Sequence, residues 1–151
     1  FTDEMAAEVA RWRTACVAAL EGPDRDVFSD TLEPVVYSER WLEEHAAERA
    51  MRREVISQLP EDWLDGLVGL LDSAESFQLH RDDLGRIRCP THVVAAELDR
   101  FIPRERTRAL AEAIPRATFE VIQGAGHAVV VEQPGLLADM IGRFVEIDAS
   151  S

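Results

Sequence analysis

The chain has 151 residues, 46% of them hydrophobic, and a formal net charge of −13. This length allows one domain with a buried core, and no apolar run reaches the length of a membrane span. The excess of acidic residues argues against nucleic acids and anionic membranes as partners. Cys16 and Cys89 stand alone and fit no metal motif, which favours reduced thiols and a cytoplasmic location. The sequence begins at Phe1 rather than Met and has no signal-peptide pattern, so we expect a cut or incompletely described polypeptide.

The first 83 residues predict a series of helices. Apolar side chains recur every three or four residues in four segments, which cover residues 3–21, 24–32, 38–58 and a stretch that begins at 61. Ser38 has the residue type of an N-cap for the third helix, whose apolar face should include Val55 and Ile56. Pro34 is expected to end the second helix, which leaves 35–37 as a loop or turn. A return loop is expected over 77–83.

The rest of the chain predicts two strands and two helices. The apolar segments 91–96 and 118–122 are typical of strands, and residues 103–114 between them have helical spacing. This order favours a parallel pair with a right-handed crossover. Pro134 is expected to open the last helix. We expect the buried stripe of that helix to consist of Leu136, Leu137, Met140, Ile141, Phe144 and Val145.

A polar residue of catalytic type follows each predicted strand. Asp99 comes just after the first strand, and His127 comes in a glycine-rich loop after the second. The carboxyl ends of parallel strands meet at one edge of a sheet, where ligands gather. An imidazole there can move a proton near neutral pH if a carboxylate fixes its tautomer. Read alone, His127 is also compatible with a turn histidine and Asp99 with a helix-entry acid, while Glu97 is a competing acid.

These residues carry a resemblance to a known family. Ala-Glu-Leu-Asp at 96–99, Gly-Ala-Gly-His at 124–127 and Glu-Gln-Pro at 132–134, together with the spacing between acid and histidine, resemble the C-terminal part of an α/β-hydrolase. Family members usually have Gly where this chain has Ala96. The resemblance implies an α/β fold, with a helical cap over 1–83 followed by a parallel β-α-β-α end of the sheet over 84–151. It further implies Asp99 as the acid and His127 as the base of a catalytic triad, with no cofactor.

The nucleophile of such a triad is missing from the sequence. The family places it in a Gly-x-Ser-x-Gly turn between a strand and a helix, and no such motif occurs here. The serines of the helical half lie in cap or linker patterns, at positions 29, 38, 57, 73 and 76. We therefore expect this chain alone to be inactive. The resemblance leaves open whether the absent nucleophile is Ser, Asp or Cys.

The resemblance implies a hydrolase of esters, lactones or related acyl compounds. Trp41 and Phe28 on apolar helix faces, and Val129 and Val130 after the histidine, are candidates for substrate contact. For the two aromatic residues, plain cap core is the other interpretation. The expected partners are a small acyl substrate and, at the outer edge of 91–96, either the missing N-terminal half or a second copy of the chain.

The alternative to an enzyme is a non-catalytic module for dimerisation or small-ligand binding, in which the Asp–His pair is vestigial. The remaining histidines do not share metal-ligand spacing, and we expect structural roles for His45, His80 and His92.

Overall fold

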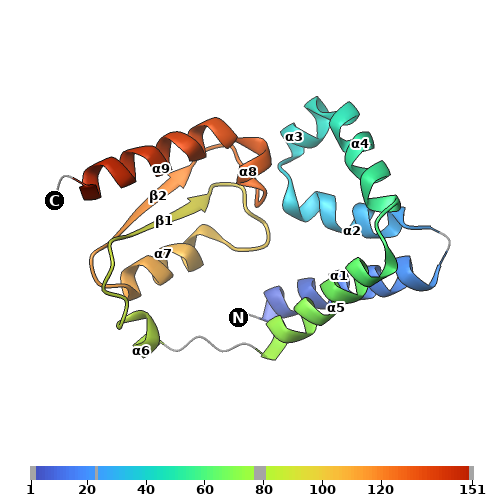
Figure 1. The fold of residues 1–151 in the computed structure, drawn as a ribbon, viewed down its shortest axis with the longest axis horizontal. Helices are drawn as coiled ribbons and strands as arrows, with labels where there is room; N and C mark the ends of the chain where they lie inside the picture. The colour runs from blue at the N-terminus through green and yellow to red at the C-terminus, as the bar shows by residue number, and fades with distance from the viewer. Residues whose placement is uncertain (1–2, 23, 77–80, 150–151) are drawn as a thin grey trace. The chain divides into compact units, whose positions relative to one another are not determined.

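The computed structural model describes residues 3–22, 24–76 and 81–149. The chain divides into two compact units. The first consists of Phe1–Val35 with Glu39–Gln78, and the second of Val36–Ser38 with Leu79–Ser151. Figure 1 shows the first unit in blue to green and most of the second in yellow to red. The assignment of residues 1–83 as a cap stays a prediction.

The first unit is built from helices. They are α1 (Asp3–Glu21), α2 (Asp26–Val36), α3 (Glu39–Glu44), α4 (Ala46–Ser57) and α5 (Glu61–Ser76). The long helices α1 and α5 lie side by side (Figure 1). Val9 and Cys16 of α1 and Leu64 and Leu71 of α5 are buried. Each pair is seven residues apart, which keeps both side chains on one face of its helix.

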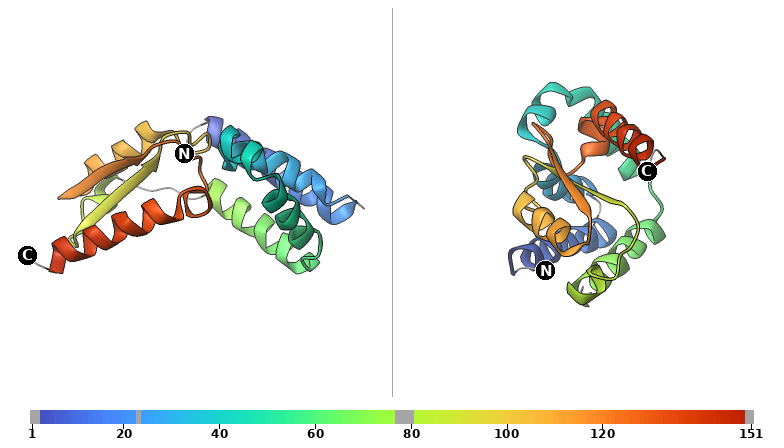
Figure 2. Two further views of the ribbon diagram at one scale, coloured as in Figure 1. Left: turned by 90° about the horizontal axis from the view of Figure 1, so that it is seen from above. Right: turned by 90° about the vertical axis from the view of Figure 1, so that its left-hand side faces the viewer.

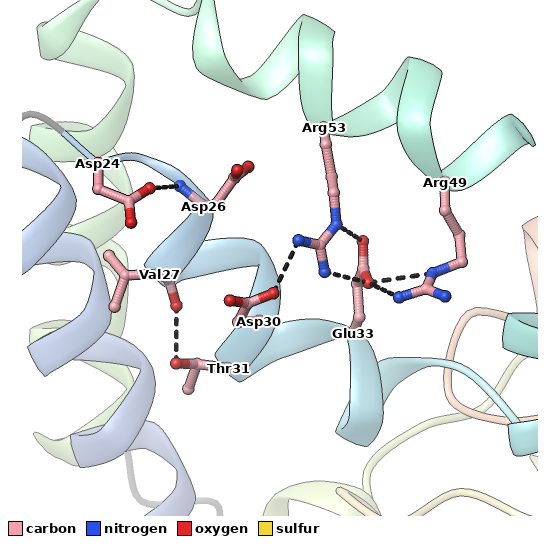
Figure 3. Close-up of polar contacts among 8 residues, drawn as sticks. All are labelled: Asp24, Asp26, Val27, Asp30, Thr31, Glu33, Arg49 and Arg53. Atoms are coloured by element: carbon pink, nitrogen blue, oxygen red, sulfur yellow. Dashed lines mark hydrogen bonds and ion pairs between the residues drawn. The ribbon is translucent and has the colours of Figure 1, made fainter. Parts of the chain in front are cut away.

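Helix α2 continues two residues past Pro34, so the predicted end at residue 32 is wrong. Proline inside a helix removes one hydrogen-bond donor and typically costs about 3 kcal/mol. The same turn contains Glu33, whose carboxylate accepts hydrogen bonds from Arg49 and Arg53 at 2.7 and 2.6 Å. Figure 3 shows both arginines reaching from α4 to this carboxylate, with Asp30 also paired to Arg53. These bonds from outside the helix hold the turn in place.

The predicted third helix is two helices. It breaks at His45, whose backbone angles of −118° and 37° are not helical. The apolar face expected on its second half is also absent, because α4 has no buried residue among those described and Val55 is 58% exposed. Part of the predicted return loop is helical as well: α6 covers Arg81–Leu84, while residues 77–80 lie outside the described part of the chain.

The second unit contains a parallel pair of strands, as predicted. Strand β1 (Thr91–Ala96) pairs with β2 (Ala117–Ile122) from Thr91 opposite Ala117 to Ala96 opposite Ile122. Helix α7 (Arg104–Ala113) connects them, and β2 is followed by α8 (Val129–Glu132) and α9 (Pro134–Ala149). Figure 2 shows α7 and α9 on opposite faces of the strand pair.

Each face of the strand pair has its own apolar cluster because side chains alternate along a strand. On the α7 face, Val93 packs with Ala111 and Ile114, and Leu84 and Ile87 join this cluster. On the α9 face, Ala96 and Ile122 pack with Met140. Leu84 and Ile87 thus anchor the segment that leads into β1 to the α7 face of the strand pair.

The buried stripe predicted for α9 is only partly present. Met140 is 5% exposed, and Leu137 packs against the same cluster. Three other members of the stripe are exposed at 50 to 59%: Leu136, Ile141 and Val145. At 100° per residue, these positions flank the line through residues 137, 140 and 144, and two strands offer too little surface to cover them.

Candidate active site

The ends of the two strands bring the predicted acid and histidine together. Hydrogen bonding continues past the strands, since the N–H of Glu97 donates to the Ile122 carbonyl and the N–H of Leu98 to the Ala125 carbonyl, both at 2.9 Å. The two loops therefore stay in register as they leave the sheet edge. Asp99 and His127 follow directly, from the β1–α7 and β2–α8 loops.

Asp99 and His127 form the hydrogen bond that the sequence predicts. The distance from His127 Nδ1 to Asp99 Oδ2 is 2.9 Å, and the two side chains are 33% and 10% exposed. A carboxylate only accepts, so Nδ1 carries the shared proton and Nε2 is left with its lone pair when the ring is neutral. The catalytic role of the pair stays a prediction.

The second carboxylate oxygen of Asp99 is also held. Its Oδ1 accepts the backbone N–H groups of Phe101 and Ile102, each at 2.8 Å. Three donors thus fix both the position and the rotation of the carboxylate. The Phe101 ring stands edge-on to the imidazole, with ring centroids 5.3 Å apart at 89°. This contact limits the rotation of the His127 ring.

Glu97, the competing acid, has a different partner. Its Oε2 accepts the N–H of Gly124 at 2.8 Å. Gly124 has a φ of 69°, in the left-handed region that favours glycine. Glu97 therefore braces the turn that begins the histidine loop, and Asp99 is the carboxylate that contacts the imidazole.

A further acid near the histidine was not predicted as a site residue. Glu132, at the end of α8, accepts hydrogen bonds from the backbone N–H of Ser38 at 2.9 Å and from its hydroxyl at 2.5 Å. The Glu-Gln-Pro motif at 132–134 marked this position as part of the resemblance without assigning it a partner. Nothing in the sequence pattern indicates that residue 38 contacts residue 132.

The candidate substrate-binding residues lie in both units. In the first, Trp41 is 5% and Phe28 3% exposed, and Trp41 stacks on His45 with ring centroids 4.8 Å apart. In the second, Val129 packs against the cluster around Met140, whereas Val130 is 68% exposed. Substrate contact by these four residues stays a prediction.

The other histidines make contacts of their own. His92 in β1 contacts the Thr118 hydroxyl at 2.6 Å through Nδ1 and stacks on Phe144. His80 lies outside the described residues. Within the described ranges, no three His, Cys, Asp or Glu side chains are grouped as metal ligands. None of the helices described there is long and apolar enough to span a membrane.

Comparison with known proteins decides the family. Residues 3–140 match the family described as "Alpha/beta hydrolase family", which is most of the chain. The chain belongs to the alpha/beta hydrolase family. Its fold is α/β, with a parallel β-α-β-α arrangement from the C-terminal part of the alpha/beta hydrolase fold, as the resemblance implied.

Curated relatives and solved structures agree with this assignment. The chain is 29% identical over 131 residues to "Putative carbamate hydrolase RutD" of Azorhizobium caulinodans, covering 84% of this chain and 47% of that protein. It superposes with a TM-score of 0.85 and 22% identity on MGS-M2, an alpha/beta hydrolase from a Medee basin deep-sea metagenome library, covering 96% of this chain and 52% of the other. A thermophilic esterase from Thermogutta terrifontis gives a TM-score of 0.76 at 25% identity, with 97% and 51% coverage. The chain thus spans about half the length of these alpha/beta hydrolases.

Proposed function

We propose that Asp99 and His127 are the acid and the base of a nucleophile–histidine–acid triad that hydrolyses an acyl substrate. The observation that carries this proposal is the hydrogen bond of 2.9 Å between His127 Nδ1 and Asp99 Oδ2. It lies beside the carboxyl ends of a parallel strand pair, in a chain of the alpha/beta hydrolase family. The Asp99 carboxylate also accepts two backbone N–H groups, and these bonds suit it to orienting an imidazole, because they keep it from turning away when the ring becomes charged.

The roles of the two residues follow from their atoms. His127 Nε2 takes the proton of the nucleophile as that group attacks the acyl carbon, and later returns it to the leaving group. Asp99 keeps the proton on Nδ1 and stabilises the imidazolium that forms in between. We place the nucleophile and the oxyanion donors outside these 151 residues, since no Gly-x-Ser-x-Gly motif occurs in them.

The substrate class is an ester, a lactone or a related acyl compound. The relatives named above as a carbamate hydrolase and an esterase support it, because carbamates and esters are both cleaved by attack at an acyl carbon. Exposed apolar side chains beside the pair favour an apolar acyl group. Leu98 precedes Asp99 at 46% exposure, and Val130 follows His127 at 68%.

The test uses p-nitrophenyl acyl esters with the full-length protein that contains this chain. We expect saturable hydrolysis that is lost in His127→Ala and kept in Asp139→Asn, a change of an exposed residue on α9. Residues 1–151 alone should not exceed the rate of free imidazole, because each absent oxyanion donor is worth ~100- to 1,000-fold. Saturable, His127-dependent turnover by residues 1–151 alone would place the nucleophile inside the chain. A full-length protein that hydrolyses no acyl ester would favour the non-catalytic module.

A further inference from the structure

The histidine loop lies directly on a segment from the other half of the sequence. Residues Val36–Ser38 belong to the second unit, although the helices on either side of them, α2 and α3, belong largely to the first. The N–H of Ala128 donates to the Val36 carbonyl at 2.9 Å. Ala128 is the residue after His127, so this bond fixes one side of the catalytic histidine's backbone.

The other side of His127 is fixed by close packing. A Cβ atom on Gly126 would lie 2.7 Å from the backbone N of Ser38 and 2.9 Å from the carbonyl carbon of Tyr37. Both distances are shorter than real Cβ contacts, so only glycine lets the loop approach this closely. Gly126 is itself buried. Any outward movement of Val36–Ser38 would remove the surface against which the histidine loop rests.

The carboxylate of Glu132 holds this segment in place. Its two oxygens accept both donors of Ser38, the backbone N–H at 2.9 Å and the hydroxyl at 2.5 Å. Ser38 is 4% exposed, so water does not replace these bonds readily. Glu132 is tied to the histidine loop at the same time, since its own N–H donates to the Ala128 carbonyl at 3.0 Å.

We infer that Glu132 is a positioning residue for His127. It clamps Val36–Ser38 onto the histidine loop and thereby sets where the imidazole Nε2 points, without contacting the imidazole. This inference rests on the proposed function in so far as it predicts an effect on turnover. The effect on the hydrogen bond between His127 and Asp99 can be measured whether or not the protein is a hydrolase.

The first test measures turnover in the full-length protein. Glu132→Ala removes both bonds to Ser38, and we expect kcat to fall on the order of 10- to 100-fold with little change in KM, because small displacements of a base are costly. Glu132→Gln should restore kcat to within a few-fold, since its carbonyl can accept the Ser38 N–H and its amide can donate to the hydroxyl. Glu112→Ala, at an exposed position on α7 of the same unit, is the matched control and should match the parent.

The second test reads the His127–Asp99 bond directly. In the ¹⁵N-histidine-labelled full-length protein, the Nδ1 proton of His127 should exchange on the order of 10-fold faster with solvent in Glu132→Ala than in the Glu112→Ala control. Ser38→Ala, which removes only the hydroxyl donor, should show a smaller change in the same direction. This variant keeps the test decisive if Glu132→Ala does not fold.

The outcomes separate the two proposals. Unchanged Nδ1 exchange in both Glu132→Ala and Ser38→Ala, or a lower melting temperature with normal kcat per folded molecule, would overturn the positioning role and leave the triad standing. Full activity of His127→Ala would overturn the triad, while faster Nδ1 exchange in the Glu132 variant would still support the clamp. Failure of Glu132→Gln to restore the kcat lost in Glu132→Ala would also count against the clamp.

Discussion

The carboxylate of Asp99 is held by hydrogen bonds to both of its oxygens. It accepts one bond from His127 Nδ1 and two from the backbone N–H groups of Phe101 and Ile102. The backbone bonds both go to Oδ1, and the imidazole bond goes to Oδ2. A change at this residue can therefore alter the imidazole contact while the turn at 99–102 is kept.

Asp99→Asn is expected to lower kcat of the full-length protein by about 10⁴-fold if the triad is correct. The amide oxygen can still accept the two backbone N–H groups, which leaves the NH₂ facing His127 and favours the wrong tautomer. Turnover of acyl esters and the melting temperature should be measured together, with Asp139→Asn as the matched control. Near-normal kcat would show that another acid, such as Glu97, orients the base.

The two cysteines should differ sharply in reactivity. Burial raises the pKa of the Cys16 thiol to about 11, and this residue is 0% exposed, whereas Cys89 is exposed. At pH 8 about one Cys16 thiol in a thousand is ionised, and the thiolate is the reactive form. We expect one thiol to be labelled rapidly by Ellman's reagent in residues 1–151, and the second only in denaturant. Rapid labelling of the native Cys89→Ser variant would contradict the buried position.

Among the elements, α4 is attached in an unusual way. It buries none of its described residues, yet Arg49 and Arg53 reach from it to the carboxylate of Glu33 on α2 (Figure 3). Glu33 is 7% exposed. Ionic hydrogen bonds rather than apolar packing thus hold α4 to α2, so this attachment should respond to pH.

The pH response has a definite sign. Burial by itself raises the pKa of the Glu33 carboxyl, but the hydrogen bonds and charges of Arg53 and Arg49 outweigh it and place the pKa below its ordinary value of 4.5. A carboxyl with a lowered pKa stabilises the fold above its unfolded pKa and loses that contribution as pH falls through the folded value. We expect Glu33→Gln to lower the free energy of unfolding of residues 1–151 by about 2 kcal/mol at pH 7. The difference from the parent should shrink below pH 4.5.

The measurement is denaturant unfolding at several pH values, with Glu48→Gln as the control. Glu48 is an exposed residue of α4, on the same helix as Arg49 and Arg53. The protection of the α4 amides against hydrogen exchange, relative to their intrinsic rates, should also fall more at low pH than that of the α5 amides. A Glu33→Gln penalty that stays constant down to pH 3 would show that the carboxylate charge does not carry the attachment.

Helix and strand boundaries show what local pattern can and cannot predict. Both strands and α7 lie where the sequence places them, because short apolar runs, helical spacing and proline signals act within a few residues. The continuation of α2 through Pro34 depends on Arg49 and Arg53, which come 15 or more residues later. Val55 is exposed because no apolar surface of the described residues packs against that face of α4. Local periodicity predicts neither the contact of Glu33 with the two arginines nor the lack of a packing partner for Val55.

Part of the candidate site could be predicted from local pattern and part could not. Asp99 and His127 were predictable because each follows a strand of a parallel pair, and the carboxyl ends of parallel strands lie at the same edge of the sheet. Ser38 and Glu132 were not paired in advance, since they are 94 positions apart and come from elements with no shared register. Only the tertiary fold brings the two residues into contact.

Strand β1 has one edge without a partner in the described sheet. The sheet contains two strands, and such a pair is marginal on its own. The backbone N–H of Glu97 donates to β2. Backbone groups alternate in direction along a strand, so the N–H groups of the odd-numbered residues of β1 point to β2. Those of His92, Val94 and Ala96 point to the opposite, unpaired edge. We propose that another strand, from the rest of the protein or from a second copy, pairs with this edge.

This proposal predicts different amide exchange along a single strand. In residues 1–151 at low concentration, the amides of His92, Val94 and Ala96 should exchange faster than those of Val93, Ala95 and Glu97. They should become protected in the full-length protein, or in a dimer detected by sedimentation. The odd-numbered amides serve as an internal control. A stable monomer with all six amides equally protected would argue against a missing strand.

The membership of Val36–Ser38 in the second unit has a consequence for protein engineering. The chain passes between the units three times, after Val35, after Ser38 and after Gln78, so a single cut at 78–79 does not separate them. A fragment starting at residue 79 would retain Asp99 and His127 but lose the carbonyl of Val36 and both donors of Ser38. Grafting a different helical unit onto this hydrolase end would therefore have to preserve three residues in the middle of the transplanted sequence.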